Sequence, residues 1–315
     1  MNRRTFLQTA ISAAALSARL PGAMQASQIG ANTAISGWSL MDSLTLLKKL
    51  RFPVVEIHPM GRPEATAGQY PGFVFDRLAD GEKAAIREAL KSFSHVTSHL
   101  PYTGVDYFAK DEATAEAAVQ VVDRAIDGSA YFGAEMLVLH PKSGSGQTLE
   151  SQWPTMLKQI RRWGDRAQKN NMRLALETGY PSSVRDFVRL VKEVDHIAVG
   201  ATIDVGHQSR YAELVAKVRA EDKATPAGIK AYNDTTLAII EGLGSKTFHL
   251  HVHDIDPATW REHQPLGTNF VDYKRLFALL NRIGYRGYLV LEIGGKPEEM
   301  EHHLSDSKQR LEAYL

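Results

Sequence analysis

The segment 249–254, which reads His-Leu-His-Val-His-Asp, places three imidazoles at alternate positions and ends in a carboxylate. Alternate side chains of a β-strand share one face, so His249, His251 and His253 are expected on the same side of a strand. A lone histidine is most often an ordinary, hydrogen-bonded core residue. Three histidines on one strand face, followed by the long loop 256–267, indicate a functional site instead.

Ionisable side chains also end most of the other segments that resemble β-strands. They are Glu56, His58, His99, His140, Glu177, Asp204 and Glu292. Together with His251, three of them form a set of three carboxylates and one imidazole from four successive strands: Glu177, Asp204, His251 and Glu292. This set suits a divalent cation such as Mn²⁺, Mg²⁺, Co²⁺ or Zn²⁺, and the absence of cysteine excludes thiolate ligands. The structural alternative is that Arg or Lys side chains neutralise these carboxylates.

The elements that must position these side chains alternate between short β-like segments and amphipathic helical segments. The predicted strands are 33–38, 54–58, 95–99, 136–140, 173–177, 197–204, 247–253 and 287–292. The predicted helices are 44–50, 82–93, 113–132, 153–169, 184–194, 232–243, 272–283 and 298–314. Eight strands, each followed by a helix, predict a single-domain (β/α)8 TIM barrel. A doubly wound open sheet is the alternative, but no Gly-rich dinucleotide loop follows the first predicted strand.

In such a barrel the carboxyl ends of all eight strands open into one mouth, where active sites lie. The polar strand ends are therefore expected to meet in a single site. The connection 208–233 is long for one loop, so we expect an insert with its own helix around 211–218.

The N-terminus has a different character from the rest of the chain. Arg3 and Arg4 precede Phe6-Leu7, an alanine-rich apolar run to Leu20 and the small residues before position 26. This pattern is typical of a cleaved twin-arginine export signal over residues 1–26, which predicts a barrel over residues 27–315 in the periplasm or otherwise outside the cytoplasm. An amphipathic N-terminal helix is the alternative interpretation.

The overall charge gives no indication of a polyanionic partner. The chain has 37 Lys and Arg against 36 Asp and Glu, a net charge of +1. Signal removal takes away three arginines and no acid, which leaves the mature chain at −2. We therefore expect no nucleic-acid partner, and no membrane association once the signal is cleaved. The oligomeric state stays open.

Seven short motifs, in this order and spacing, resemble those of the xylose isomerase-like barrel superfamily, which includes sugar isomerases, sugar epimerases and relatives of endonuclease IV. The motifs lie at 98–102 (SHLPY), 139–141 (LHP), 176–178 (LET), 203–207 (IDVGH), 251–254 (HVHD), 263–267 (HQPLG) and 291–292 (LE). The resemblance covers essentially the whole mature chain. It implies one divalent metal on Glu177, Asp204, His251 and Glu292, with the two glutamates also acting as acid and base. It further implies that His207 and Arg261 hold substrate oxygens.

The nuclease branch of this superfamily uses three zinc ions. Its extra ligands would correspond to His99, His140, His207, His263 and an acid two residues before His263, where this chain has Arg261. A cation at a ligand position repels a third metal ion, so we rank cleavage of DNA phosphodiesters low. A second metal on His99, His140 and Glu177 remains open.

The predicted function is a metal-dependent sugar isomerase or epimerase that abstracts a proton next to a carbonyl and passes through an enediolate. The substrate-binding residues expected are His99, His140, His207, Arg261, His263, Glu56 and Trp38. One alternative is a lyase or hydratase that acts on 3-keto glycosides by β-elimination at the same metal. Another is a non-catalytic, exported sugar-binding protein.

Overall fold

The computed structural model describes residues 24–60 and 72–315. The predicted export signal lies outside these ranges except for its last three residues, of which Met24 is buried in the core. Within the described residues, no helix is both long enough and apolar enough to cross a membrane.

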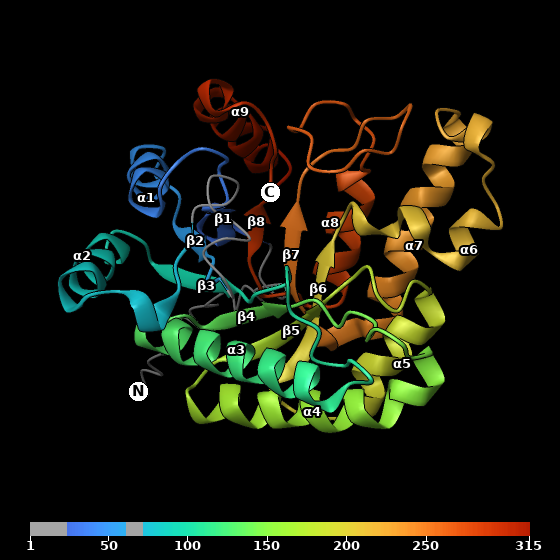
Figure 1. Ribbon diagram of the computed structural model, residues 1–315. Helices are drawn as coiled ribbons and strands as arrows, with labels where there is room; N and C mark the ends of the chain where they lie inside the picture. Colours follow the sequence, from blue (N-terminus) through green and yellow to red (C-terminus); the bar gives the residue numbers. More distant parts are fainter. Residues whose placement is uncertain (1–23, 61–71) are drawn as a thin grey trace, which may run out of the picture.

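Eight parallel strands form a closed barrel in which each strand pairs with its neighbours in sequence order, and β8 closes the ring on β1 (Figure 1). The strands are β1 Ile29–Asn32, β2 Val54–Ile57, β3 His95–His99, β4 Met136–Leu139, β5 Arg173–Glu177, β6 Val199–Asp204, β7 Thr247–Val252 and β8 Leu289–Leu291. This is the (β/α)8 TIM barrel that the sequence predicts.

Helices surround the barrel (Figure 1). They are α1 Leu40–Lys49, α2 Asp80–Leu90, α3 Glu112–Tyr131, α4 Leu149–Lys169, α5 Val184–Val194, α6 Ala212–Val215, α7 Pro226–Leu243, α8 Tyr273–Arg282 and α9 Met300–Glu312. Side chains that accept a backbone N–H start several of them, for example Ser39 before α1, Asp111 before α3 and Ser183 before α5. The last helix lies beside the first, and an ion pair of 2.6 Å between Lys49 and Glu301 joins them.

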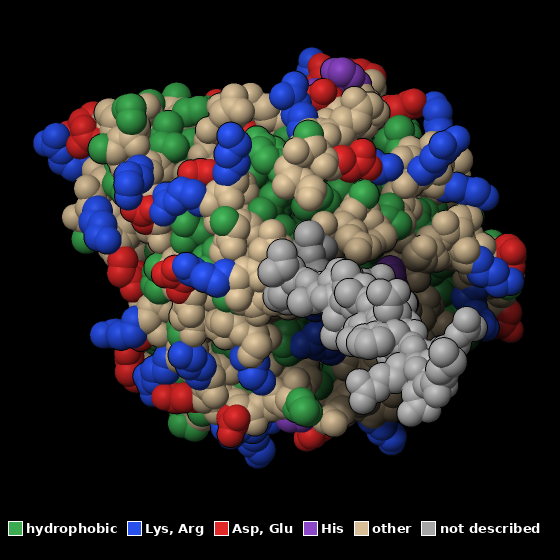
Figure 2. Space-filling model, turned by 180° about the vertical axis from the view of Figure 1, so that it is seen from behind, with side chains coloured by type: hydrophobic (Ala, Val, Ile, Leu, Met, Phe, Trp, Pro, Cys, Tyr) green, Lys and Arg blue, Asp and Glu red, His purple; other side chains and the backbone are tan. Residues whose placement is uncertain are grey.

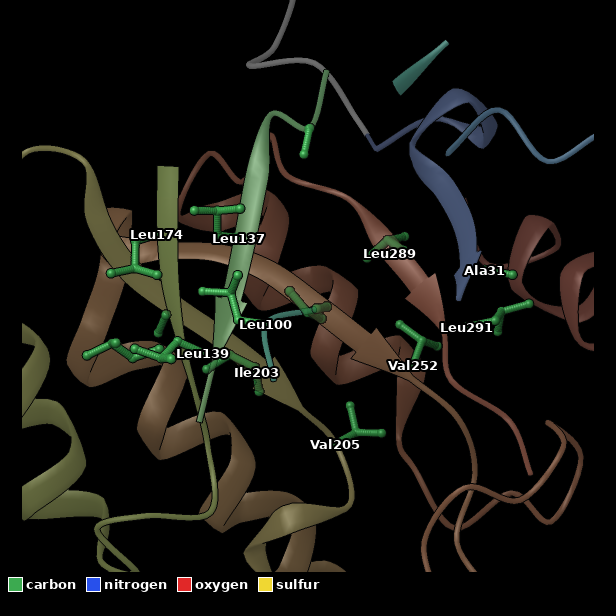
Figure 3. Close-up of a cluster of buried hydrophobic side chains, with 14 of the residues drawn as sticks. Ala31, Leu100, Leu137, Leu139, Leu174, Ile203, Val205, Val252, Leu289 and Leu291 are labelled. Carbon is green, nitrogen blue, oxygen red and sulfur yellow. The ribbon is translucent and has the colours of Figure 1, made fainter. Parts of the chain in front are cut away.

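The two faces of the strands differ sharply in chemistry. Aliphatic side chains from neighbouring strands pack together in the layer between the strands and the helices (Figure 3). They include Leu137, Leu139, Leu174, Ile203, Val252, Leu289 and Leu291. The residues between them in sequence face the barrel interior, because side chains alternate along a strand. This alternation directs Glu177, Asp204 and His251 inward.

The lower part of the barrel interior, toward the amino ends of the strands, contains a separate buried apolar cluster of Met136, Ala175 and Phe248. Gly200 leaves the space for it, since a Cβ at this position would lie 2.5 Å from the Phe248 ring. The guanidinium of Arg173 stacks on that ring. The predicted metal ligands lie farther up, toward the carboxyl ends of the strands.

Some element boundaries differ from those predicted. The first strand is Ile29–Asn32 and not 33–38, because the chain turns at Gly37, which has a φ of 78°. The sixth strand begins at Val199, and Ile197 before it is 79% exposed. The insert contains a helix, but α6 is only four residues long and α7 begins at Pro226, earlier than expected.

Charged side chains on the face seen in Figure 2 are mixed, with Lys and Arg next to Asp and Glu. No broad area of one sign is visible among the described residues of that face. This distribution agrees with the nearly balanced composition.

Candidate active site

Three carboxylates converge on one nitrogen of His251 at the upper end of the barrel. His251 Nδ1 lies 2.8 Å from Glu177 Oε1, 2.8 Å from Glu292 Oε2 and 3.8 Å from Asp204 Oδ2. Glu177 and Asp204 end β5 and β6, His251 lies in β7, and Glu292 directly follows β8. The structure thus brings together the four side chains that the sequence predicts as metal ligands.

The donor set fits a divalent cation. Donor atoms that share a cation at about 2.1 Å lie roughly 3.0–3.4 Å from one another, which is close to the spacing around His251 Nδ1. Among the described residues, every basic side chain within 4 Å of Glu177, Asp204 or Glu292 is a histidine. No Lys or Arg in this part of the chain neutralises the carboxylates, which removes the structural alternative.

The acids stay ionised despite their burial. Burial alone would raise the pKa of Glu177, but His140 and His251 beside it hold that pKa well below its usual range. The same balance, with His251 as the main opposing group, lowers the pKa of Glu292 to about 2. Burial would lower the pKa of His207, but Asp204 and Glu177 raise it to about 9. At neutral pH the carboxylates are therefore anionic, and His207 is protonated.

Two more histidines contact the other oxygen of Glu177. His140 Nε2 is 2.7 Å and His99 Nε2 is 3.2 Å from Glu177 Oε2. His99 Nδ1 also hydrogen-bonds the Leu100 carbonyl at 3.0 Å, which fixes its ring. Glu177 therefore lies within 4 Å of four imidazoles, those of His99, His140, His207 and His251, and it can join two groups of ligand atoms, one on each oxygen.

His253 belongs to the histidine pattern but is not one of the predicted ligands or substrate-binding residues. His253 Nε2 lies 3.1 Å and 3.2 Å from the two oxygens of Asp204. Burial would lower the pKa of His253, but Asp204 raises it above its usual range. His253 thus holds Asp204 in place from the side away from His251.

The β7–α8 loop is anchored by Asp254, which is 2% exposed. Its two carboxylate oxygens accept the backbone N–H groups of five residues: Ile255, Gly267, Asn269, Phe270 and Val271. Asp254 is therefore a structural part of the motif at 251–254. Its fixed loop carries Arg261, Glu262 and His263 to the mouth of the barrel.

Glu262, not Arg261, faces the histidines at the mouth. Glu262 oxygens lie 4.0 Å from His207 Nε2 and 3.9 Å from His263 Nε2. Arg261 is exposed and donates to Gln264 at 3.2 Å. Glu262 is not among the residues predicted from the sequence, where its neighbour Arg261 was expected to bind substrate instead.

A cavity of about 480 Å³ opens over this site. Its lining includes His140, Lys142, His207, Arg261 and Glu262. The site reaches solvent on this side, since the side chains of Glu292 and His140 are each 20% exposed whereas that of Glu177 is 1% exposed. His263, whose Nδ1 hydrogen-bonds the Glu292 carbonyl at 2.9 Å, is 30% exposed.

Four of the seven predicted substrate-binding residues do not line this cavity. Trp38 lines a different one of about 410 Å³, between α1 and α9, together with Asp42, Lys49 and Glu301. Glu56 is fully buried below His251. His99 contacts Glu177, and His263 lies 3.9 Å from Glu262, which lines the cavity. The remaining three, His140, His207 and Arg261, line the cavity.

The comparisons with known proteins concern this same barrel. A family model described as "Xylose isomerase-like TIM barrel" matches residues 44–313. An uncharacterized protein of Methanocaldococcus jannaschii is 20% identical over an alignment of 214 positions that covers 62% of this chain. The chain spans 64% of the length of that relative.

Several solved structures share the fold at low sequence identity. A D-tagatose 3-epimerase-like protein is 18% identical with a TM-score of 0.66, and the match covers 91% of this chain and 96% of the other. D-psicose 3-epimerase from Clostridium cellulolyticum H10 is 14% identical with a TM-score of 0.66, covering 91% and 99%. The 3-keto-D-glucoside 4-epimerase of E. coli is 18% identical with a TM-score of 0.64, again covering 91% and 99%.

Proposed function

Because this chain belongs to the xylose isomerase-like TIM barrel family, we propose that it is a divalent-metal-dependent sugar isomerase or epimerase. The observation that carries the proposal is the convergence of three carboxylates on His251 Nδ1 below an open cavity. Similar structures carry the names of sugar epimerases, which supports a carbohydrate substrate.

A cation held by Glu177, Asp204, His251 and Glu292 would polarise a substrate carbonyl and make the neighbouring C–H more acidic. Glu177 and Glu292 contact the same imidazole nitrogen, so both carboxylates face the region where that carbon would lie. Their low pKa values keep them ionised at neutral pH. Either glutamate is thus available to take the proton. Isomerisation can return this proton from the same glutamate, whereas epimerisation requires the opposite glutamate to enter the reaction protonated.

The direction of proton return decides the reaction. Return to the neighbouring carbon interconverts an aldose and a ketose, and return to the same carbon from the opposite face gives an epimer. Glu292 is the more accessible of the two glutamates, so we assign it the first contact with substrate.

His207 supports a second candidate, β-elimination from a 3-keto glycoside. It lines the cavity and lies 3.7 Å from Glu177 and 3.8 Å from Asp204. An imidazolium at the cavity wall is a suitable acid for protonating a leaving alcohol. This route uses the same metal and the same initial proton abstraction.

We favour carbohydrate over nucleic acid as substrate. Arg261 stands at the acid position of the nuclease branch, and the face in Figure 2 has mixed charges where a DNA-binding surface would be basic. A purely sugar-binding role would not require two glutamates so placed. His99 and His140 place ligand atoms next to Glu177 Oε2, so the proposal also allows a second cation there.

The test is an activity screen with and without metal. Mn²⁺-loaded and EDTA-treated protein are incubated with D-tagatose, D-psicose and a 3-keto glucoside, and the products are identified by ¹³C NMR. Epimerised or isomerised sugar formed only with metal supports the proposal. An unsaturated keto sugar indicates the lyase instead, and product formed equally after EDTA treatment contradicts the metal requirement.

Export through the twin-arginine pathway is also a proposal, based on Arg3-Arg4 and Phe6-Leu7. A metalloprotein gains from export after folding, because its ion can be loaded first. Replacing both arginines by lysine should retain the protein in the cytoplasmic fraction. Unchanged export of that variant would contradict the proposal.

A further inference from the structure

A carboxylate, Glu56, lies directly below the proposed metal ligand His251. Glu56, His249 and His251 are all 0% exposed. Glu56 contacts both His249 and His251, which alternate on β7, so it lies between these two residues along the strand. Its complete burial puts it out of reach of a substrate in the cavity.

Each oxygen of Glu56 has its own set of contacts. Oε2 accepts a hydrogen bond from Thr97 Oγ1 at 3.0 Å and lies 3.2 Å from His249 Nε2. Oε1 lies 3.1 Å from His251 Nε2. The N–H direction is not aligned with Oε1, yet neither atom has another hydrogen-bond partner among the described residues. These two buried atoms are therefore each other's only available partner.

Coordination of a cation by His251 Nδ1 would use the lone pair of that nitrogen and leave the ring hydrogen on Nε2, because a neutral imidazole carries one N–H. Nε2 faces Glu56 Oε1 at 3.1 Å, while Nδ1 faces Glu177 and Glu292. Glu56 is thus placed to hold the ring in the orientation that a cation on Nδ1 requires.

We propose that Glu56 is the positioning residue of the metal centre: it fixes the orientation and tautomer of His251 and does not bind substrate. The inference rests on the metal centre proposed above. A carboxylate behind a ligating histidine typically contributes 10- to 100-fold to metal affinity.

Glu56, His249 and His251 also place three donor atoms within 4.8 Å of one another, which raises the question of a cation between them. Only one of the three is an acid, and one of its oxygens already accepts the Thr97 hydroxyl. A single carboxylate in a fully buried position is a poor match for a divalent charge. The positioning role explains the same geometry without a second charge.

Glu56→Gln tests the proposal, because it keeps the shape and removes the charge. We expect the Kd for Mn²⁺, measured by isothermal titration calorimetry on the folded protein, to rise 10- to 100-fold. The increase should fall on the metal Kd and not on the KM for sugar at saturating Mn²⁺. A wild-type metal Kd combined with a raised sugar KM would overturn the proposal and restore a substrate-binding role.

Thr97→Val is the matched control. It removes the hydroxyl on Glu56 Oε2 and leaves the contact between Oε1 and His251 intact. We expect a lower Tm with a Mn²⁺ Kd within about threefold of wild type. If both variants weakened metal binding equally, the effect of Glu56 would be one of packing and the proposal would be wrong.

A measurement on the wild-type chain covers the case in which Glu56→Gln does not fold. Long-range ¹H–¹⁵N spectra of the Zn²⁺-loaded protein, with the His251 signals identified from a His251→Gln sample, should show hydrogen on Nε2. Hydrogen on Nδ1 would overturn the proposal. If wild type binds no divalent metal, the proposed metal centre fails as well; if it binds metal and Glu56→Gln binds equally, only the role of Glu56 fails.

Discussion

The upper and lower halves of the barrel interior are built by the same strands but differ in chemistry. At the lower end, Met136, Ala175 and Phe248 pack as an ordinary apolar cluster. At the upper end, β5 and β7 place Glu177 and His251 almost without solvent exposure. Burying charged groups costs free energy unless each is paired. The buried charges of the upper half are therefore tolerated because they balance one another. We attribute their presence to the proposed function.

Asp204→Asn should have the largest effect on the upper half, because it should abolish metal binding there. The substitution keeps the shape but removes one of three negative charges around His251 Nδ1 and the partner of His253. We expect metal content below one tenth of wild type, with turnover lost. Elemental analysis of purified protein measures it, and equal metal in both proteins would contradict the ligand assignment.

Glu292→Gln should separate chemistry from metal binding. The amide retains one oxygen near the metal but cannot accept a proton, so turnover should fall at least about 10²-fold. Glu177→Gln should do the same for an epimerase, whereas a lyase should show unequal effects of the two substitutions.

Glu135→Gln is the control for these glutamates, because Glu135 lies just before β4 at the other end of the barrel, beside His95. Its turnover should equal that of wild type. Turnover within a few-fold of wild type in Glu292→Gln, with metal bound, would show that another group is the base.

His58 should make the upper half sensitive to acid. Burial and the neighbouring His99 lower its pKa to about 4, whereas the unfolded value is near 6.5. The folded state holds His58 neutral, so its contribution to stability is complete above pH 6.5 and is lost as the pH falls from 6.5 to 4. The full loss is about 3 kcal/mol.

His58→Asn cannot take up this proton. Urea unfolding of the metal-free proteins at pH 7.5 and 4.5 should therefore show a smaller loss of stability at low pH in the variant than in wild type. The same loss in both proteins would show that other groups cause the acid sensitivity.

Ile203→Val should give the smallest effect, on stability alone. Ile203 precedes Asp204 on β6 but belongs to the apolar layer under the helices (Figure 3). Loss of one buried methyl group costs about 0.5–1.5 kcal/mol. The free energy of unfolding should fall by this amount while metal content stays the same; a change in metal content would show that the two faces of β6 are coupled.

The sequence predicted the barrel and the direction of most site residues, because alternation along a strand determines which side chains point inward. It could not determine the depth of each residue in the barrel, which depends on how the strands are staggered around it. Glu56 and His251 both point inward, but Glu56 is fully buried and contacts both His249 and His251. Because of this depth, Glu56, which was predicted to contact substrate, is instead a buried neighbour of the proposed ligand His251.

The orientation of loop side chains was the second feature that the sequence could not predict. Arg261 and Glu262 are neighbours in sequence, and no periodicity tells which of them faces the histidines. Backbone hydrogen bonds between Asp254 and Gln264, and one from His263 N–H to His253 Nδ1, hold the segment next to Glu262. The Glu262 carboxylate lies 4.0 Å from His207. Trp38 is another loop residue whose position could not be predicted: its loop places it between α1 and α9 and away from the main cavity.

The central claim is proton abstraction by a glutamate at a metal centre, and incubation of the metal-loaded protein with its sugar substrate in D₂O tests it most directly. The account predicts solvent deuterium at the carbon next to the carbonyl in the product, and none above background with Glu292→Gln. Product that forms with the original hydrogen retained, and at the same rate in wild type and Glu292→Gln, would contradict the account, because a glutamate that carried this hydrogen could not be replaced by Gln without loss of turnover.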